Sequence, residues 1–161
     1  QQDGLFVSNK SALGIEIKLG AKTTPYQIVK YAYLLCLEEQ IFGQKENLGL
    51  LYIRPNLSLD KMSRECGFEW PNLTDATHFY ESIPVSKRSN KTVNRFIEQS
   101  PERFYSVLER MKFGCISWGK FNCSISNILR ELDRSEPGEQ TLFRLLSGFQ
   151  KQLISHKNTG I

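Results

Sequence analysis

Hydrophobic and polar residues alternate near the start of the chain, in the pattern of a half-buried β-strand. This pattern predicts a strand over residues 13–19, after a shorter strand over residues 5–7 and a polar turn. Successive side chains point to opposite faces of a strand, so Glu16 and Lys18 share one face and the aliphatic residues between them share the other. We expect the aliphatic face to enter the core and the face of Glu16 and Lys18 to border a cleft or solvent.

The turn sets which residues of the two strands face each other. If Asn9-Lys10 is a two-residue turn, the numbers of paired residues sum to 19. Asp3 then lies opposite Glu16, and directly opposed side chains have Cβ atoms about 4.5–5.5 Å apart. This register predicts two neighbouring carboxylates with Lys18 one step along the strand, whereas a slip by one residue would destroy the arrangement.

Helix signals follow the hairpin. Thr24 suits an N-cap, Pro25 the first helical position and Gly43 the helix end, with apolar residues at helical spacing between them. A buried strand is expected over residues 48–53. The remaining expected elements are a short helix over 60–66, a loop around 70–72, a helix from 101, a strand over 113–117, and helices over 124–132 and 137–154.

This order of elements predicts an α/β fold, in which a small mixed β-sheet is flanked by helices. A chain of 161 residues suits one domain. We expect a single domain over residues 1–161, with core motifs in 3–53, an irregular insert over about 56–82 and a helical C-terminal part over 100–157.

The charge of the chain is concentrated in one segment. The net charge is +4, and residues 84–97 contribute +4 through Lys87, Arg88, Lys91 and Arg95 without any acid, so the rest of the chain is neutral. A neutral body with one basic segment fits an anionic partner, although a solvated basic loop would have the same composition.

Several classes of protein do not fit the composition. The longest apolar run, Tyr31 to Leu37, is too short to span a bilayer, so no membrane partner is expected. The four cysteines form no CxxC pair and only two histidines accompany them, so a zinc site is not expected. We interpret the thiols as reduced and expect a cytoplasmic protein.

Two adjacent carboxylates repel each other unless a positive charge neutralises them. Mg²⁺ suits this position, because it binds carboxylate oxygens, water and substrate phosphate. A lysine beside the ion can orient or help to deprotonate an attacking water. Asp3, Glu16 and Lys18 therefore suit metal-assisted hydrolysis of a phosphodiester. The alternative is an ordinary salt bridge on the surface of a hairpin.

The chain contains Asp3, the run Gly14-Ile15-Glu16-Ile17-Lys18 and the later pair Gln27 and Tyr31. Together these residues resemble the motifs of the PD-(D/E)XK nuclease superfamily, in its RecB-like branch with a QxxxY motif. The resemblance implies a restriction-endonuclease-like fold. It also implies Mg²⁺ or Mn²⁺ bound by Asp3, Glu16 and the Ile17 carbonyl, with Lys18 positioning the nucleophilic water.

By the same resemblance, Gln27 and Tyr31 would approach the metal site or the DNA backbone. Gln27 also has capping-box spacing from Thr24, and Tyr31 could be an ordinary core aromatic. The chain is then expected to be a nuclease acting on nucleic acid, in the first instance DNA. The alternative is a catalytically inactive nuclease-like module that binds DNA or a protein, and a homodimer or fusion to a larger protein stays open. The cations expected to contact phosphates are Lys22, Lys30, Lys87, Arg88, Lys91 and Arg95.

Overall fold

The computed structural model describes residues 4–19, 21–55 and 58–156. The chain divides into two compact units, of which the first comprises residues 1–17, 22–52 and 58–114 and the second residues 18–21, 53–57 and 115–161. The expectation of a single domain therefore stays a prediction. No helix within the described ranges has the length and apolar character needed to cross a membrane.

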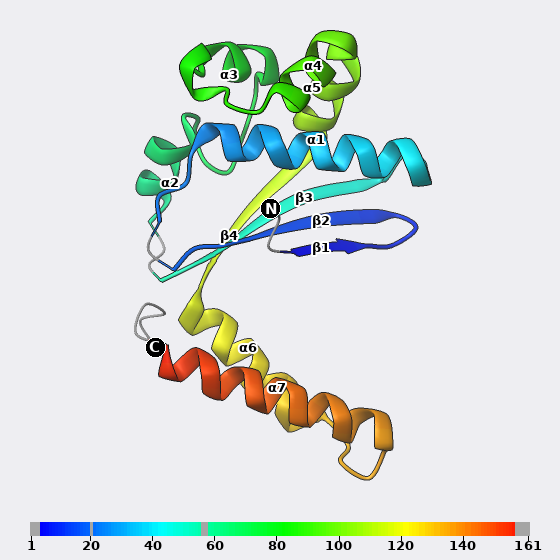
Figure 1. Ribbon diagram of the computed structural model, residues 1–161. Helices are drawn as coiled ribbons and strands as arrows, with labels where there is room; N and C mark the ends of the chain where they lie inside the picture. Colours follow the sequence, from blue (N-terminus) through cyan, green and yellow to red (C-terminus); the bar gives the residue numbers. More distant parts are fainter. Residues whose placement is uncertain (1–3, 20, 56–57, 157–161) are drawn as a thin grey trace. The chain divides into compact units, whose positions relative to one another are not determined.

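A four-stranded sheet with the order β1-β2-β3-β4 among the described residues lies mainly in the first unit, while the last residues of β3 and β4 belong to the second (Figure 1). The strands are β1 (Gly4–Val7), β2 (Ser11–Ile17), β3 (Asn47–Arg54) and β4 (Met111–Ser117). A hairpin joins β1 to β2, and an 18-residue helix joins β2 to its neighbour β3, the type of connection that parallel neighbours need. The α/β class predicted from the sequence is confirmed.

The register of the first hairpin is the one that a two-residue turn predicts. Gly4 pairs with Ile15 and Val7 with Ala12, so paired numbers sum to 19. The Ser8 hydroxyl oxygen accepts hydrogen bonds from the backbone of the turn, which closes it tightly. Asp3, the predicted partner of Glu16, lies outside the described residues.

Helix α1 (Pro25–Phe42) begins and ends where the sequence predicts. Gly43 adopts the positive φ of 84° and donates its backbone N–H to the Glu39 carbonyl at 3.0 Å. Helix α1 lies along the sheet, and a further layer of helices packs on it (Figure 1). The other helices of this unit are α2 (Leu59–Cys66), α3 (Ala76–Ser82), the 3₁₀ turn η1 (Val85–Lys87), α4 (Lys91–Gln99) and α5 (Pro101–Arg110).

The expectation that the aliphatic face of β2 enters the core is wrong. Ala12, Gly14 and Glu16 are on the buried face of the strand, whereas Leu13 and Ile17 are 36% and 37% exposed. The physical reason is that α1 packs on β2 from the side of the smallest residues, because a helix can come closest to a strand where side chains are short. Glu16 is therefore largely enclosed beneath α1 and borders a cavity.

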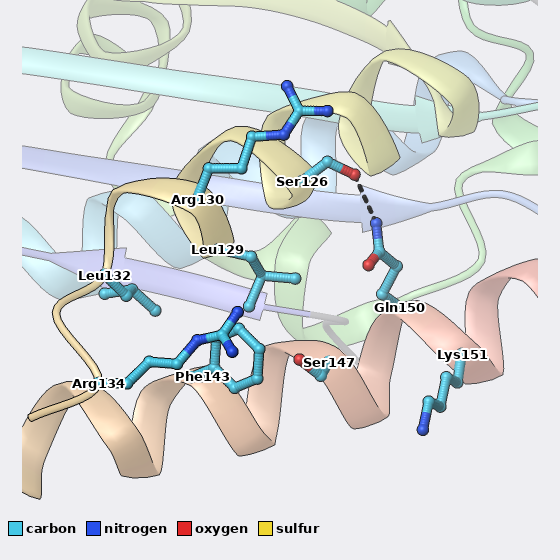
Figure 2. A pocket seen from close by; sticks show the side chains of 9 residues that line it. All are labelled: Ser126, Leu129, Arg130, Leu132, Arg134, Phe143, Ser147, Gln150 and Lys151. Carbon is cyan, nitrogen blue, oxygen red and sulfur yellow. Dashed lines mark hydrogen bonds between the residues drawn. The ribbon is translucent and has the colours of Figure 1, made fainter.

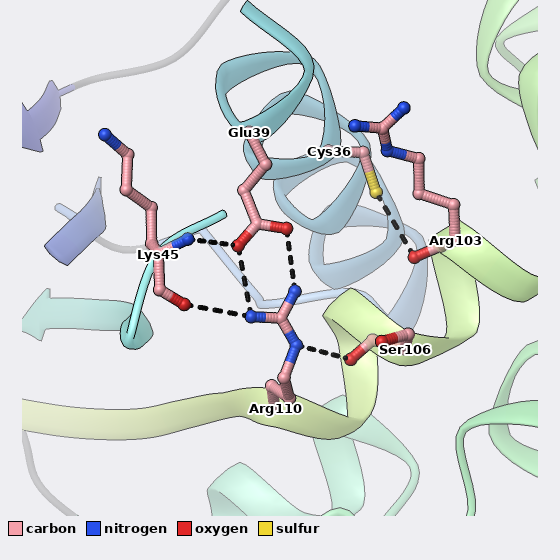
Figure 3. A network of polar contacts seen from close by, with 6 residues as sticks. All are labelled: Cys36, Glu39, Lys45, Arg103, Ser106 and Arg110. Carbon is pink, nitrogen blue, oxygen red and sulfur yellow. Dashed lines mark hydrogen bonds and ion pairs between the residues drawn. The ribbon is translucent and has the colours of Figure 1, made fainter. Parts of the chain in front are cut away.

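A partly buried ion pair, Arg110 with the buried Glu39, joins the end of α1 to the end of α5 (Figure 3). Arg110 donates two hydrogen bonds to the Glu39 carboxylate, at 2.7 and 3.1 Å, and a third to the Lys45 carbonyl at 3.0 Å. The Lys45 backbone N–H donates to the same carboxylate at 2.8 Å. Three hydrogen bonds satisfy this carboxylate, which is why it can be buried.

The second unit contains an antiparallel pair of helices, α6 (Trp118–Glu131) and α7 (Pro137–Ser155). Trp118, Ile125 and Leu153 are buried. The indole N–H of Trp118 donates to the Lys18 carbonyl at 3.2 Å, and the Lys18 N–H donates to the Ile53 carbonyl at 2.8 Å. These two bonds connect the segment after β2 to the other parts of this unit.

The expected irregular insert contains more structure than its sequence indicated. The short helix over 60–66 is confirmed as α2, but α3 was not expected within it. Helix α4 was not expected either, because its sequence was interpreted as part of a basic segment. Asn90 begins α4 by accepting hydrogen bonds from the backbone of Thr92 and Val93, at 3.0 and 3.2 Å.

Candidate active site

A buried glutamate near the end of β2 is the centre of the candidate site. Glu16 is 8% exposed, and both of its carboxylate oxygens accept hydrogen bonds from α1. Gln27 donates through Nε2 to Oε1 at 2.9 Å, and the Tyr31 hydroxyl donates to Oε2 at 2.7 Å. Because Gln27 and Tyr31 are four positions apart, they lie one above the other on the face of α1 that covers β2. We call these three residues the Glu16 cluster.

Gln27 serves the helix and the cluster at the same time. Its Oε1 accepts the Thr24 backbone N–H at 3.1 Å, while its Nε2 donates to Glu16. An amide side chain has separate donor and acceptor atoms, so one residue can cap α1 and hold the carboxylate. The two interpretations that the sequence left open are therefore compatible, and the cap fixes the direction in which the amide donates.

Tyr31 is both a core aromatic and a member of the cluster. It is 4% exposed, and its hydroxyl oxygen lies 2.7 Å from the Ile15 carbonyl oxygen as well as 2.7 Å from Glu16 Oε2. A hydroxyl has one proton, so Tyr31 can donate to only one of these acceptors at a time. The Tyr31 hydroxyl thus lies between the β2 backbone and the Glu16 carboxylate.

Gly14 makes room for the Tyr31 ring. A Cβ atom at position 14 would lie 2.6 Å from Cδ1 and 2.9 Å from Cε1 of Tyr31, distances that real Cβ atoms do not show. The absence of a side chain at Gly14 is what lets the ring lie flat enough on β2 for its hydroxyl to reach Glu16. Sequence reasoning included Gly14 in the motif without a role; a glycine inside a strand is the signal that could have indicated this close approach.

The cluster opens on a cavity of about 240 Å³. Glu16 is the only carboxylate that lines it within the described ranges, and Lys30 supplies its cation. The Lys30 ammonium lies 5.5 Å from the centre of the Tyr26 ring, in a cation–π arrangement. The full lining is Glu16, Gln27, Lys30, Tyr31, Tyr33, Leu34, Asn90 and Val93.

Tyr26 brings the start of α4 to this cavity. Its hydroxyl accepts the Asn90 backbone N–H at 3.2 Å and lies 3.0 Å from Asn94 Oδ1, to which it donates. Burial raises the pKa of Tyr26, so the phenol keeps its proton for this contact. Two consecutive residues of α1 thus have different tasks: Tyr26 positions α4, and Gln27 positions Glu16. The sequence contained no signal for this tertiary contact.

The predicted phosphate-contacting residues have different surroundings. Arg88 donates to the Ile83 carbonyl at 2.9 Å and the Tyr80 carbonyl at 3.1 Å, so its guanidinium is engaged at the end of α3. Lys30 is the one member of the predicted set that lines the cavity within the described ranges. The exposed members are Lys22, Lys87, Lys91 and Arg95.

Lys18 belongs to the second unit, and the residue is 5% exposed. A lysine is almost never buried to this extent unless it has a specific role or partner. Asp3 lies outside the described residues, and the metal-binding role predicted for the Ile17 carbonyl stays a prediction. Over the ranges that the structure describes, no group of three histidine, cysteine, aspartate or glutamate side chains is placed to hold a metal ion.

The carboxylate of the Glu16 cluster is suited to be one of the ligands of a hard divalent cation. This carboxylate accepts hydrogen bonds from two neutral groups, Gln27 and Tyr31, at 2.9 and 2.7 Å. Carboxylate oxygens are ligands that hard divalent cations prefer. A complete site needs further oxygen ligands, and Asp3 is the predicted source.

Comparisons with known proteins add no family. No protein-family model matches the chain, and neither a curated protein nor a solved structure was found to match it.

Proposed function

We propose that this chain is a metal-dependent nuclease with a restriction-endonuclease-like fold that hydrolyses DNA phosphodiester bonds. The observation that supports this most is the Glu16 cluster, in which a buried carboxylate on a strand is held by Gln27 and Tyr31 on the helix that follows. A carboxylate enclosed beneath a helix costs stability, and a protein keeps one for a reason. Binding a divalent cation is such a reason.

In this proposal, Asp3, Glu16 and the Ile17 carbonyl hold Mg²⁺ or Mn²⁺. When bound, the ion supplies a water of lowered pKa and stabilises charge on the phosphate. Asp3 and Ile17 are proposed as ligands from the sequence motif alone. Glu16 is proposed both from the motif and from the hydrogen bonds that hold its carboxylate.

The protein's own groups prepare the site. Gln27 and Tyr31 fix the direction of the two Glu16 oxygens, so the carboxylate does not need to reorganise when it binds a cation. Lys18 orients the attacking water, a role that the motif assigns. Lys30, which lines the cavity, presents its ammonium to the phosphate of a bound strand.

One observation favours a second candidate function. Glu16 is the only carboxylate that lines the cavity among the described residues. If Asp3 does not join it, the fold would serve as an inactive module that binds DNA or a protein partner, since fold does not determine function.

The test is cleavage of labelled single-stranded and double-stranded DNA with Mg²⁺, with Mn²⁺ and with EDTA, together with Mn²⁺ binding followed by calorimetry. We expect the wild type to cut DNA only with metal. Glu16→Gln should lose both cutting and Mn²⁺ binding. Lys18→Ala should lose cutting and keep Mn²⁺ binding, because a lysine positions water and does not bind a cation.

The matched control is Glu98→Gln, which removes the same charge from an exposed position on α4. It should leave cutting and Mn²⁺ binding unchanged. A wild type that binds no Mn²⁺ and cuts no DNA would reject the nuclease proposal. DNA binding by that same protein would then support the inactive module.

A further inference from the structure

A hollow of about 610 Å³ lies between α6 and α7, within the second unit (Figure 2). Its rim carries three exposed cations, Arg130, Arg134 and Lys151, and no acid lines it within the described ranges. This volume is within the range of pockets that hold small ligands. We call it the hairpin hollow.

None of the three cations of the hairpin hollow forms an ion pair within the part of the chain that the structure describes. Cations without an ion-pair partner keep their N–H donors available to an anionic ligand. The lining of the hollow thus offers three charged donor groups and no carboxylate within the described ranges.

Four acids, Glu131, Asp133, Glu136 and Glu139, lie in the adjoining stretch of chain, and none of them lines the hollow within the described ranges. Asp133 accepts hydrogen bonds from the Ser135 backbone N–H at 2.9 Å and from the Ser135 hydroxyl at 2.7 Å, and these bonds lower the pKa of its carboxyl. Glu139 accepts the backbone N–H of Asp133. Both carboxylates thus stabilise the α6–α7 loop.

The hollow is also held in shape before any partner binds. Arg134 stacks its guanidinium on the Phe143 ring, 3.9 Å from the ring centre, which limits the motion of the side chain and leaves its N–H edge for a ligand. Gln150 donates to Ser126 Oγ at 2.7 Å and so joins α7 to α6 (Figure 2). Preorganised donors lose less entropy when they bind an anion.

We propose that the hairpin hollow binds the phosphodiester backbone of nucleic acid, with Arg130, Arg134 and Lys151 contacting phosphates. Guanidinium groups match phosphate geometry with two parallel hydrogen bonds, and hydroxyl and amide groups beside them are the usual accompaniment of phosphate contacts. The apolar floor that includes Phe143 offers a surface for a base or sugar. This inference deepens the proposed function and rests on it for the identity of the substrate class.

The test measures binding in EDTA, so that cleavage plays no part in the result. Fluorescence anisotropy of a fluorescein-labelled DNA strand, alone and as a duplex, gives the affinity of the full chain from about 50 to about 200 mM salt. The test variant is Arg130→Gln with Arg134→Gln. The matched control is Lys120→Gln with Arg144→Gln, which removes the same charge from exposed positions on α6 and α7 outside the hollow.

We expect the test variant to bind DNA about 100-fold more weakly, about tenfold for each charged contact. The slope of log affinity against log salt should become shallower by about 2 for the duplex. The control should lose less than about threefold. Arg130→Lys with Arg134→Lys should keep the salt slope and lose part of the affinity, because lysine keeps the charge without the planar fork.

Three outcomes would overturn the inference. Test and control variants could weaken binding equally, which would show a diffuse charge effect. The test variant could bind as the wild type does. The wild type could bind anionic phosphatidylglycerol vesicles and no DNA, which would indicate a lipid surface. A failure of cleavage with intact, salt-dependent DNA binding would reject the nuclease proposal and leave this one standing.

Discussion

Adding a single methyl group at Gly14 should disturb the Glu16 cluster without changing any of its members. In Gly14→Ala the new Cβ would lie 2.6 Å from Tyr31 Cδ1, so the ring must move by about 0.8 Å to reach an ordinary contact of 3.4 Å. Tyr31 is 4% exposed and α1 is packed against both β2 and α5, so the ring can move only toward the cavity that it lines. A shift of that size also stretches the 2.7 Å hydrogen bond to Glu16 beyond a useful length.

The expected cost combines two effects. Overpacking a close-packed core costs about 1–3 kcal/mol. Losing a hydrogen bond to a buried carboxylate costs about 1.5–3 kcal/mol. The two overlap, since movement of the ring relieves the clash by breaking the bond, so we expect Gly14→Ala to lower the free energy of unfolding by about 2–4 kcal/mol. Mn²⁺ binding should weaken as well.

Urea unfolding followed by tryptophan fluorescence measures this loss. The matched control is Gly4→Ala in the facing strand, where a Cβ would meet its nearest atoms at an ordinary 3.6 Å. That change should stay within about 0.5 kcal/mol. Tyr31→Leu removes the ring, so in that background Gly14→Ala should cost less than about 1 kcal/mol.

Two results would refute this reasoning. An equal cost of Gly14→Ala with and without the Tyr31 ring would show that the clash lies elsewhere. A cost below about 0.5 kcal/mol would show that the ring and strand are not in close contact.

Glu16→Gln should leave the free energy of unfolding within about 1 kcal/mol of the wild type in the same urea assay. The new amide can accept a hydrogen bond from Gln27 and donate one to the Tyr31 hydroxyl oxygen, and the Tyr31 hydroxyl can then donate to the Ile15 carbonyl. Arg110→Met should lower it by about 3 kcal/mol, since the buried Glu39 carboxylate loses two hydrogen bonds, and Glu39→Gln in that background should restore part of the loss. Burial raises the pKa of the Cys36 thiol to about 12, with a smaller contribution from the Glu39 charge, so at pH 8 it should resist a thiol reagent that modifies the exposed Cys123 within minutes. Modification of Cys36 in folded protein at the rate of Cys123 would contradict its burial.

Local signals in the sequence were sufficient for most of the regular elements. The Asn9-Lys10 turn predicted the register of the first hairpin correctly, because a two-residue turn permits one pairing of the flanking strands. Thr24, Pro25 and Gly43 predicted the bounds of α1, because caps act within one helical turn. Gln27 and Tyr31, which the motif resemblance expects near the candidate site, are four positions apart and both donate to Glu16.

Contacts between distant segments could not be predicted in the same way. Alternation showed that the two faces of β2 differ, but only the packing of α1 decided that the face with Glu16 is the buried one. The same holds for α4, which Tyr26 draws to the cavity from a segment interpreted as a basic loop, and for Arg88, whose guanidinium is engaged by carbonyl groups at the end of α3.

The division follows from the range of the forces involved. Turn chemistry, caps and side-chain periodicity depend on residues a few positions apart, so the sequence by itself determined the hairpin register, α1 and the shared face of Gln27 and Tyr31. Burial depends on which surfaces fit closely, and that is settled when chain segments far apart in sequence meet. The tertiary structure alone therefore decided that Glu16 is enclosed, that Gly14 admits the Tyr31 ring, and that cations of both α6 and α7 line the hairpin hollow.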